Sequence, residues 1–372
     1  MTLRVGKLVY GIIKLLPCLL AVLLVSSCSS DVNSDEQKGN KTLVTLTIAA
    51  SGNAATASRA ISGNSSTITR ASASVSDPTN KDYYISDLTV LIFDESGDVI
   101  GSTTKQAPFS SSGGNITIQV LTRAAKKCTV YAIANALALN DGATPPFAGV
   151  ATLSALQSKV KTYKDADDIN KESCLLMMGK TESFDTTNGS AAAISLQRLA
   201  SRIDFNFTVN NDKITGFPIV VDSYQLCNVP TSTFYQQSNF NSPLMPSGTL
   251  YKSQGLITPS TAGTPKPYTC YVYTNIDTDT SNKTYLLINA HSAVTAGSTT
   301  YKIWNSVFHV NMLDGVKPNM HYTVNITING GATGDTEQGG CGAVATYEAY
   351  PYFSGSILNP WGPNENKDLD LQ

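Results

Sequence analysis

Apolar and polar residues alternate over short runs along most of the chain, and this period of two constrains the fold more than any other feature. In residues 41–49, Val44, Leu46 and Ile48 fall on one face and threonines fall on the other. Residues 203–209 and 322–328 repeat the pattern. Because successive side chains of a β-strand point to opposite faces, each run predicts a strand with one buried face.

Further strands are predicted where β-branched and aromatic residues cluster between turn formers. One helix is predicted at residues 153–163, where apolar residues recur every three or four positions and would pack into the core. Two runs of roughly seven strands predict an all-β protein of two tandem β-sandwiches, residues 71–192 and 193–372. The other strands are expected at residues 85–93, 99–104, 115–121, 128–135, 218–227, 268–274, 284–290 and 301–312.

The first 28 residues carry the pattern of a bacterial lipoprotein signal. A basic start is followed by an apolar run at residues 15–25 and by Val25-Ser26-Ser27-Cys28. Residues 1–27 are therefore predicted to be a signal peptide, with Cys28 as the lipidated first residue of the mature chain. Lys14 and Pro17 interrupt the apolar stretch, which argues against a retained membrane span. We expect acyl chains on Cys28 to hold the exported protein at an envelope membrane.

The charge balance excludes one class of partner. Removing the signal peptide lowers the number of Lys and Arg residues from 26 to 23, against 28 Asp and Glu, which leaves a net charge of about −5. No basic stretch resembles a nucleic-acid surface. Partners are expected among proteins or glycans, and not among nucleic acids.

The segment between the first two predicted strands is nearly devoid of large apolar residues. From residue 51 to residue 80 only Ile61, Ile68 and Val75 are of that kind, and the segment contains Arg59 and Arg70. So little apolar surface cannot offset the entropy lost on ordering. We predict a long loop that proteases can reach.

The residue types needed for catalysis or metal binding do not form recognisable motifs. The chain has three histidines (His291, His309 and His321), none with a metal-ligand partner at the usual spacing, and it has no nucleophile motif. We predict no enzymatic activity, no cofactor and no metal site. Asp165, Asp167 and Asp168 are either a weak calcium ligand set or a solvated loop, with the loop favoured.

Two other groups of residues leave alternatives open. Five cysteines follow Cys28, so either one or two disulfides form or the thiols are buried and free. The C-terminal aromatics suit either a glycan-binding platform or an assembly surface. The cysteines are Cys128, Cys174, Cys227, Cys270 and Cys341, and the aromatics are Tyr347, Tyr350, Tyr352 and Trp361.

An ordered set of short motifs resembles the FimA-type fimbrillins, the type V pilins of Gram-negative anaerobes. After the lipoprotein signal and the arginine loop come Leu88-Thr-Val-Leu-Ile-Phe93 and Val130-Tyr-Ala-Ile-Ala-Asn135. Each motif is short, and the specific feature is their order along nearly the whole mature chain. The remaining motifs are Leu196-Gln-Arg-Leu-Ala-Ser-Arg-Ile203, Asn228-Val-Pro230, Tyr271-Val-Tyr-Thr-Asn275 and His321-Tyr-Thr-Val-Asn-Ile-Thr-Ile328.

The resemblance implies a fold and a life cycle. Its members have two transthyretin-like β-sandwiches, reach the outer membrane as lipoproteins, and are cut by an arginine-specific protease. The strand containing Val44, Leu46 and Ile48 would then leave with the lipid, which makes residues 28–70 a propeptide. A strand from another copy or a related fimbrial subunit would fill the groove and build an adhesive surface fimbria. Arg59 is the favoured cut because its Ser-Arg-Ala context resembles the family's, and Arg70 is the rival.

The C-terminus departs from the family pattern of a plain alternating donor strand. Pro351, Pro360 and Pro363 each remove a backbone hydrogen-bond donor. Either residues 343–350 or the segment from Trp361 onward would have to donate. A subunit with a poor donor strand could instead retain its lipid as an anchor, or cap the filament at its tip.

Overall fold

The computed structural model describes residues 40–49, 75–109, 111–112, 115–211, 217–260, 263–312 and 315–328, and the backbone of strands at residues 343–351 and 365–370. All of these residues belong to one structural unit that spans residues 39–372. Strands dominate the unit, so the predicted all-β class is confirmed. Its two described α-helices, α1 (Leu153–Gln157) and α2 (Asp168–Lys171), are short. No helix in the described part is long and apolar enough to cross a membrane.

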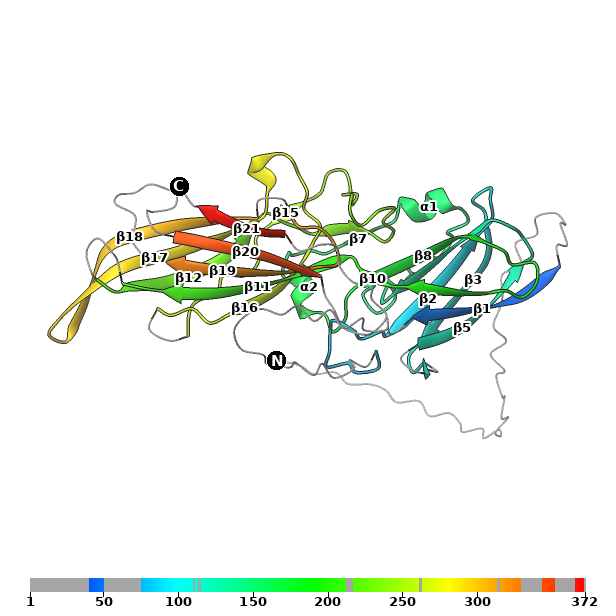
Figure 1. Ribbon diagram of the computed structural model, residues 1–372, viewed down its shortest axis with the longest axis horizontal. Helices are drawn as coiled ribbons and strands as arrows, with labels where there is room; N and C mark the ends of the chain where they lie inside the picture. The colour runs from blue at the N-terminus through cyan, green and yellow to red at the C-terminus, as the bar shows by residue number, and fades with distance from the viewer. Residues whose placement is uncertain are drawn as a thin grey trace, which may run out of the picture. The chain divides into compact units, whose positions relative to one another are not determined.

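The first half of the described chain forms a nine-stranded sheet (Figure 1). Eight strands follow the order β10-β8-β6-β2-β3-β5-β1-β9, and the short β4 pairs with β5. Because β9 at one edge and β10 at the other are separated by Leu196 alone, the sheet must curl back on itself. The strands are β1 (Lys41–Ala49), β2 (Asp87–Phe93), β3 (Val99–Gln106), β4 (Ser111–Ser112), β5 (Asn115–Arg123), β6 (Cys128–Ala134), β8 (Met177–Phe184), β9 (Ala191–Ser195) and β10 (Gln197–Arg198).

One face of this sheet is covered by apolar residues, and the other is covered over part of its strands. The enclosed face holds one core, which includes Leu46 of β1, Ile92 of β2 and Ile118 of β5. The opposite face holds a second core, in which Phe93 and Tyr131 pack edge to face with ring centroids 5.9 Å apart. Strand β2 is buried along its whole length because it contributes to both cores.

The second half of the chain forms two facing sheets around a third core. Five strands follow the order β16-β11-β19-β20-β21, and three follow β12-β17-β18. The core draws Phe205 and Val324 from the first sheet and Ile288 and Phe308 from the second. The strands are β11 (Ala200–Val209), β12 (Ile219–Cys227), β16 (Tyr268–Tyr273), β17 (Tyr285–Ala296), β18 (Thr299–Asn311), β19 (Met320–Ile328), β20 (Ala343–Pro351) and β21 (Glu365–Asp370).

The helix predicted at residues 153–163 is wrong beyond its first turn. Helix α1 begins where Thr152 accepts a hydrogen bond from the amide of Ala155, and it ends at Gln157. Residues Val160–Thr162 form strand β7, which pairs with β14 (Ser232–Phe234). The three- and four-residue spacing was a coincidence, because pairing with a strand far along the chain outweighed the local helical pattern.

The other predicted strands are present, with ends displaced by a few residues. Sequence reasoning missed several further strands, of which β8 and β9 complete the first sheet. Strands β13 (Val229–Pro230) and β15 (Tyr251–Lys252) form a separate two-stranded pair. Among the described cysteines the alternative of buried free thiols is confirmed, for Cys128, Cys174, Cys227 and Cys270. Cys341 lies outside the described residues.

Candidate functional site

Strand β1 occupies an interior slot of the first sheet, between β5 and β9. Figure 1 shows it beside β5. It pairs antiparallel with β5 from Lys41 opposite Arg123 to Ile48 opposite Ile116. On its other side it pairs parallel with β9 from Thr45 to Ala49. Both backbone edges of β1 are therefore hydrogen-bonded to neighbours that follow it in the sequence.

The three apolar residues predicted for a releasable strand lie in the core. Val44, Leu46 and Ile48 are each 0% exposed. Their period of two puts all three on the enclosed face, as the sequence pattern predicts. Burying a side chain of this size stabilises a fold by about 1.5–3 kcal/mol, so the three together contribute roughly 5–9 kcal/mol.

The strands on either side of β1 rely on it for most of their backbone hydrogen bonds on that side. In the described sheet β9 is hydrogen-bonded to no strand other than β1. Strand β5 meets β3 at a single pair, Gly101 opposite Thr122, and it meets β4 over two residues. Removal of β1 would therefore leave unpaired backbone groups on two strands and three empty apolar positions between them, a state that is costly in free energy.

The outward face of β1 carries an exposed apolar residue opposite another on β5. Leu43 and Leu121 are register partners on β1 and β5, and their exposed fractions are 50% and 57%. Burial of Val44 and exposure of Leu43 on adjacent positions define the two faces of the strand clearly. The inward side of β1, and not the outward side, contributes most to its stability.

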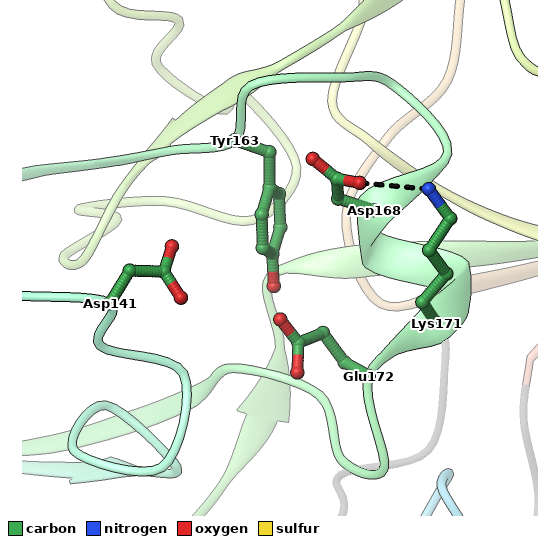
Figure 2. Close-up of a pocket in the computed structure, with 5 residues that line it drawn as sticks. All are labelled: Asp141, Tyr163, Asp168, Lys171 and Glu172. Carbon is green, nitrogen blue, oxygen red and sulfur yellow. Dashed lines mark hydrogen bonds and ion pairs between the residues drawn. The ribbon is translucent and has the colours of Figure 1, made fainter.

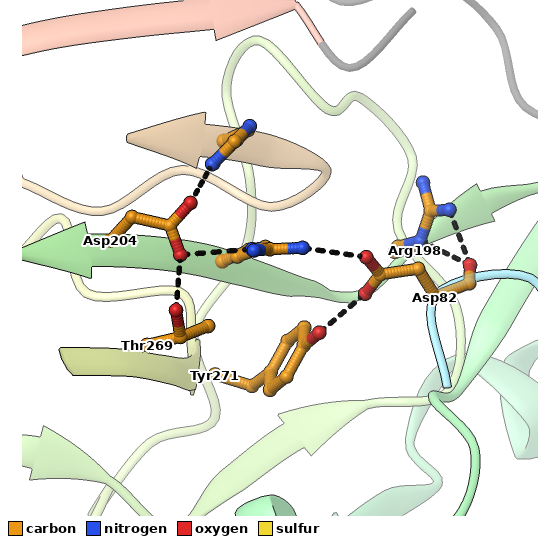
Figure 3. Close-up of polar contacts among 7 residues, drawn as sticks. Asp82, Arg198, Asp204, Thr269 and Tyr271 are labelled. Atoms are coloured by element: carbon orange, nitrogen blue, oxygen red, sulfur yellow. Dashed lines mark hydrogen bonds and ion pairs between the residues drawn. The ribbon is translucent and has the colours of Figure 1, made fainter. Parts of the chain in front are cut away.

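The segment that follows the arginine loop is held by polar contacts at Asp82 (Figure 3). The buried Asp82 carboxylate accepts hydrogen bonds from the Tyr271 hydroxyl at 2.6 Å and from Arg202 at 3.1 Å. The Asp82 carbonyl accepts a hydrogen bond from Arg198 Nε at 2.7 Å. Asn135, which directly follows β6, adds bonds to Tyr84 and Ser86 on the same segment. These contacts fix the chain downstream of both candidate cut sites.

Arg202 forms ion pairs with Asp82 and with a second carboxylate, Asp204. Figure 3 shows the two carboxylates. Arg202 Nε lies 3.0 Å from Asp204 Oδ1, and Asp204 also bonds to Thr269 at 2.7 Å and to His321 Nε2 at 2.6 Å. Burial alone would raise the pKa of Asp204, but hydrogen bonds from His321, Arg202 and Thr269 outweigh it and hold the pKa well below its ordinary value. Asp204 is therefore a charged anchor of this network at neutral pH.

The network gives a structural role to residues that the motifs contained but did not explain. Arg198, Arg202, Tyr271 and His321 belong to three of the motifs quoted above, and all contact Asp82 or Asp204. Sequence reasoning missed Asp82 itself, because a single aspartate in a polar stretch carries no signal. His321 proved to be paired with a carboxylate, a contact that sequence spacing could not reveal.

The C-terminal strands lie at the edge of the second half's five-stranded sheet. Strand β20 pairs with β19 from Ala343 opposite Ile328 to Pro351 opposite Met320, and β21 pairs with β20. Two of the predicted aromatics, Tyr347 and Tyr350, are register partners of Val324 and His321. Tyr352 and Trp361 lie outside the described residues. The backbone thus places residues 343–351 within a sheet of this same chain.

The remaining predicted site residues separate into two groups. Cys28, Arg59 and Arg70 lie outside the described residues. The three aspartates near α2 take different partners: Asp165 pairs with Lys252, Asp168 pairs with Lys171, and Asp167 accepts a hydrogen bond from Asn170. No cluster of three or more His, Cys, Asp or Glu in the described part is arranged to hold a metal ion.

Sequence comparison shows which class of protein this chain resembles. Residues 44–215 match the family model described as major fimbrial subunit protein (FimA). This region begins within β1 and ends beyond β11, so it includes the slot of β1 and both arginines of the Asp82 network. The resemblance to FimA-type fimbrillins predicted from the motifs is confirmed. No curated protein matches the sequence.

Particular solved structures share the fold. A candidate cell adhesion protein from Bacteroides eggerthii is 20% identical, with 85% of this chain and 97% of that chain covered and a TM-score of 0.55. A candidate cell adhesion protein from Parabacteroides distasonis is 12% identical, with coverages of 83% and 98% and a TM-score of 0.56. A fimbrilin (FimA) from Porphyromonas gingivalis is 16% identical, with coverages of 86% and 99% and a TM-score of 0.53.

Proposed function

We propose that this protein is a fimbrial subunit whose first strand is exchanged for a strand of another subunit. The precursor is a lipoprotein attached to the outer membrane through Cys28. An arginine-specific protease cuts it after Arg59 or Arg70, and β1 then leaves with the lipid. Polymerisation moves the subunit from the membrane to a surface fimbria used for adhesion.

The observation that carries this proposal is the position of β1. A strand of nine residues, hydrogen-bonded on both edges and buried through Val44, Leu46 and Ile48, immediately precedes the arginine loop. A cut in that loop turns β1 from a covalent part of the sheet into a bound peptide. An extended segment with the same alternation could replace it, because strand addition uses main-chain hydrogen bonds for affinity and side-chain pockets for specificity.

The anchored segment downstream of the loop supports the same proposal. Residues 75–86 are held to the sheets by side-chain hydrogen bonds at Asp82 and Asn135, whereas β1 is held by its backbone ladders and its buried apolar side chains. After a cut at Arg59 or Arg70, the segment at residues 75–86 would therefore stay attached to the sheets while another strand replaces β1. Exchange between subunits is head-to-tail, and such contacts build filaments instead of closed rings.

A lipid-retaining anchor or tip subunit is the second candidate, and the C-terminal strands favour it. Strands β20 and β21 are paired within their own sheet. Donation of either strand to a neighbour would first require that pairing to break. A subunit that accepts a strand but does not donate one would end a filament.

The N-terminal residue of the protein in purified surface filaments tests the proposal. A stalk subunit is expected to begin at Ala60 or Ala71 and to run as a heat-sensitive ladder on a denaturing gel. Chains that all begin at acylated Cys28 and run as a single band would contradict polymerisation by loss of β1. The Arg59→Gln and Arg70→Gln variants then identify the cut, because only one of them should preserve the precursor.

A further inference from the structure

A polar cavity of about 280 Å³ lies on the first half of the chain, away from the slot of β1. Its lining comes from the loop after β6, the end of β7 and helix α2 (Figure 2). This volume is just below the range of about 300–1,000 Å³ that is typical of sites for drug-sized ligands, so it suits one side-chain-sized group. The lining residues are Asp141, Tyr163, Asp168, Lys171 and Glu172.

The Tyr163 hydroxyl has an unused hydrogen-bonding capacity in this cavity. Tyr163 is 5% exposed, and its hydroxyl is directed toward the space between Asp141 and Glu172 (Figure 2). No described residue makes a hydrogen bond of good geometry to that hydroxyl; the Tyr273 hydroxyl, which is likewise buried without such a bond, interacts with it. Its ring stacks on Tyr273 with centroids 5.8 Å apart, so the hydroxyl cannot easily turn elsewhere. A buried polar group without a partner is destabilising, and a ligand that bonds to this hydroxyl would remove that penalty.

The lysines near the cavity are already bound to other acceptors. Lys171 pairs with Asp168 at 3.0 Å. Lys161 donates to the carbonyl of Leu139, and its longer contact to Asp141 measures 3.4 Å. Lys81 donates to the carbonyl of Ile169 and lies 4.9 Å from the Tyr271 ring centroid.

Lys161 and Lys81 attract the Glu172 carboxylate electrostatically but form no ion pair with it in the described structure. Burial raises the pKa of Glu172, and the attraction of the two lysines offsets this only in part. The Asp141 side chain is 83% exposed, so its single long contact with Lys161 leaves it able to turn to another donor. Three acceptors therefore converge on the cavity: the Tyr163 oxygen and the carboxylates of Asp141 and Glu172.

We propose that this cavity binds a nitrogen cation at the end of an alkyl chain, either a guanidinium or a primary ammonium group. A guanidinium carries five N–H donors and an ammonium carries three, which matches convergent acceptors. An anion would be repelled by two carboxylates, and a neutral polyol would leave the half-buried Glu172 charge without a counter-ion. The same chemistry is offered by an arginine or lysine side chain of a protein and by a free polyamine. The inference is independent of strand exchange.

Isothermal titration calorimetry on the full chain tests the site. The probes are Nα-acetyl-L-arginine amide, which stands for a protein side chain, and putrescine, which stands for a free polyamine. Nα-acetyl-L-citrulline amide, in which a neutral urea replaces the guanidinium, is the matched control. We expect at least one cation to bind at least tenfold more tightly than the citrulline compound. The stronger of the two cations identifies the source of the ligand.

Variants locate the binding in the cavity. Tyr163→Phe and Glu172→Gln should each weaken binding of the preferred cation about tenfold. Glu182→Gln, which removes an exposed carboxylate paired with Lys180 on β8, should leave it unchanged. Circular dichroism reports whether each variant folds. If Tyr163→Phe does not fold, Glu172→Gln still tests the site. Three results would overturn the proposal. The citrulline and arginine amides could bind equally, neither cation could bind, or Glu172→Gln could leave the affinity unchanged.

Discussion

Strands β1 and β21 lie near opposite ends of the described chain, and they are held in opposite ways. Strand β1 has a partner on each edge, β5 and β9, and its inward side chains are completely buried. Strand β21 is the last strand of its sheet and pairs with β20 alone. Strand β1 lies inside its sheet although it is the first described strand of the chain, whereas β21 lies at the edge of its sheet.

Loss of an interior strand and loss of an edge strand have different consequences for a sheet. Removing an edge strand shortens a sheet and leaves a new edge, which proteins tolerate. Removing an interior strand leaves a slot with two unpaired sides and apolar pockets, so the slot binds another strand strongly. In the described structure β1 is such an interior strand, and the proposed cleavage after Arg59 or Arg70 would disconnect it from the rest of the chain.

Deletion of whole strands should produce the largest contrast. Deleting residues 40–49 removes roughly 5–9 kcal/mol of apolar burial together with two hydrogen-bonded ladders, a loss comparable to the whole stability of a domain. We expect the first sheet to unfold or the protein to aggregate. Deleting residues 365–370 should lower the melting temperature by about 2–4 °C. Calorimetry with gel filtration measures both, and equal effects of the two deletions would refute the contrast.

Single side chains on the two faces of β1 sharpen the comparison within one strand. Leu46→Ala should lower the free energy of unfolding by about 2–5 kcal/mol, because the site is completely buried. Leu43→Ala is the matched control on the 50% exposed face, and its change should stay within about 0.5 kcal/mol. Urea unfolding followed by tryptophan fluorescence and circular dichroism gives both values. Similar losses for the two variants would mean that the inward face does not hold the strand.

Loss of a contact in the Asp82 network should lower the free energy of unfolding less than loss of β1 does. It should lower it more than a substitution on the outward face of β1 does. Tyr271→Phe removes the donor of a 2.6 Å hydrogen bond to a charged, buried carboxylate, which is worth about 1.5–3 kcal/mol. Thr269→Ala, which removes a bond to Asp204 at the edge of the network, should cost about 1 kcal/mol or less. The free energy of unfolding measures both. If Tyr271→Phe is neutral, the segment after the arginine loop is not held as described.

The pH dependence of stability should show the smallest of these effects. Because hydrogen bonds hold the pKa of Asp204 below its unfolded value of about 3.9, this group stabilises the fold above that pH and loses its contribution as pH falls toward the folded pKa. Asp204→Asn should therefore flatten part of the stability loss of the native protein below about pH 4. An unchanged acid limb in this variant would show that Asp204 is not the responsible group.

Local patterns in the sequence predicted most strands but not their partners. Residues 41–49 and 322–328 each form a strand with one buried face. Such a strand needs an apolar residue at every second position, so the alternation can be read directly from the sequence. That β1 pairs parallel with β9 could not be read from the sequence, because β9 is Ala-Ala-Ala-Ile-Ser, with little apolar character, and lies far along the chain. The false helix at residues 153–163 has the same origin, since β7 is fixed by a distant strand.

The candidate site was predicted in part for a related reason. Val44, Leu46 and Ile48 could be assigned to a buried face by their spacing, and their burial is complete. The two-sided slot around them depends on sheet order, which is a long-range property. The Asp82 network joins residues from four separate segments of the chain, so no single motif could indicate that they meet.

The most direct test of the central claim locks β1 in its slot. Thr47 and Thr117 are register partners on β1 and β5, and paired strands bring Cα atoms to about 4.5–5.5 Å, a distance that suits a disulfide. The double variant Thr47→Cys/Thr117→Cys is treated with an arginine-specific protease, and assembly is followed as a ladder on a denaturing gel. The control Thr89→Cys/Thr104→Cys crosslinks β2 to β3, where the two hydroxyls lie 2.9 Å apart.

The account predicts that the oxidised β1–β5 lock gives a single band, that reductant restores the ladder, and that the β2–β3 crosslink assembles in both conditions. A ladder of equal strength from the oxidised lock, with its disulfide intact, would contradict the claim that β1 must leave for subunits to join.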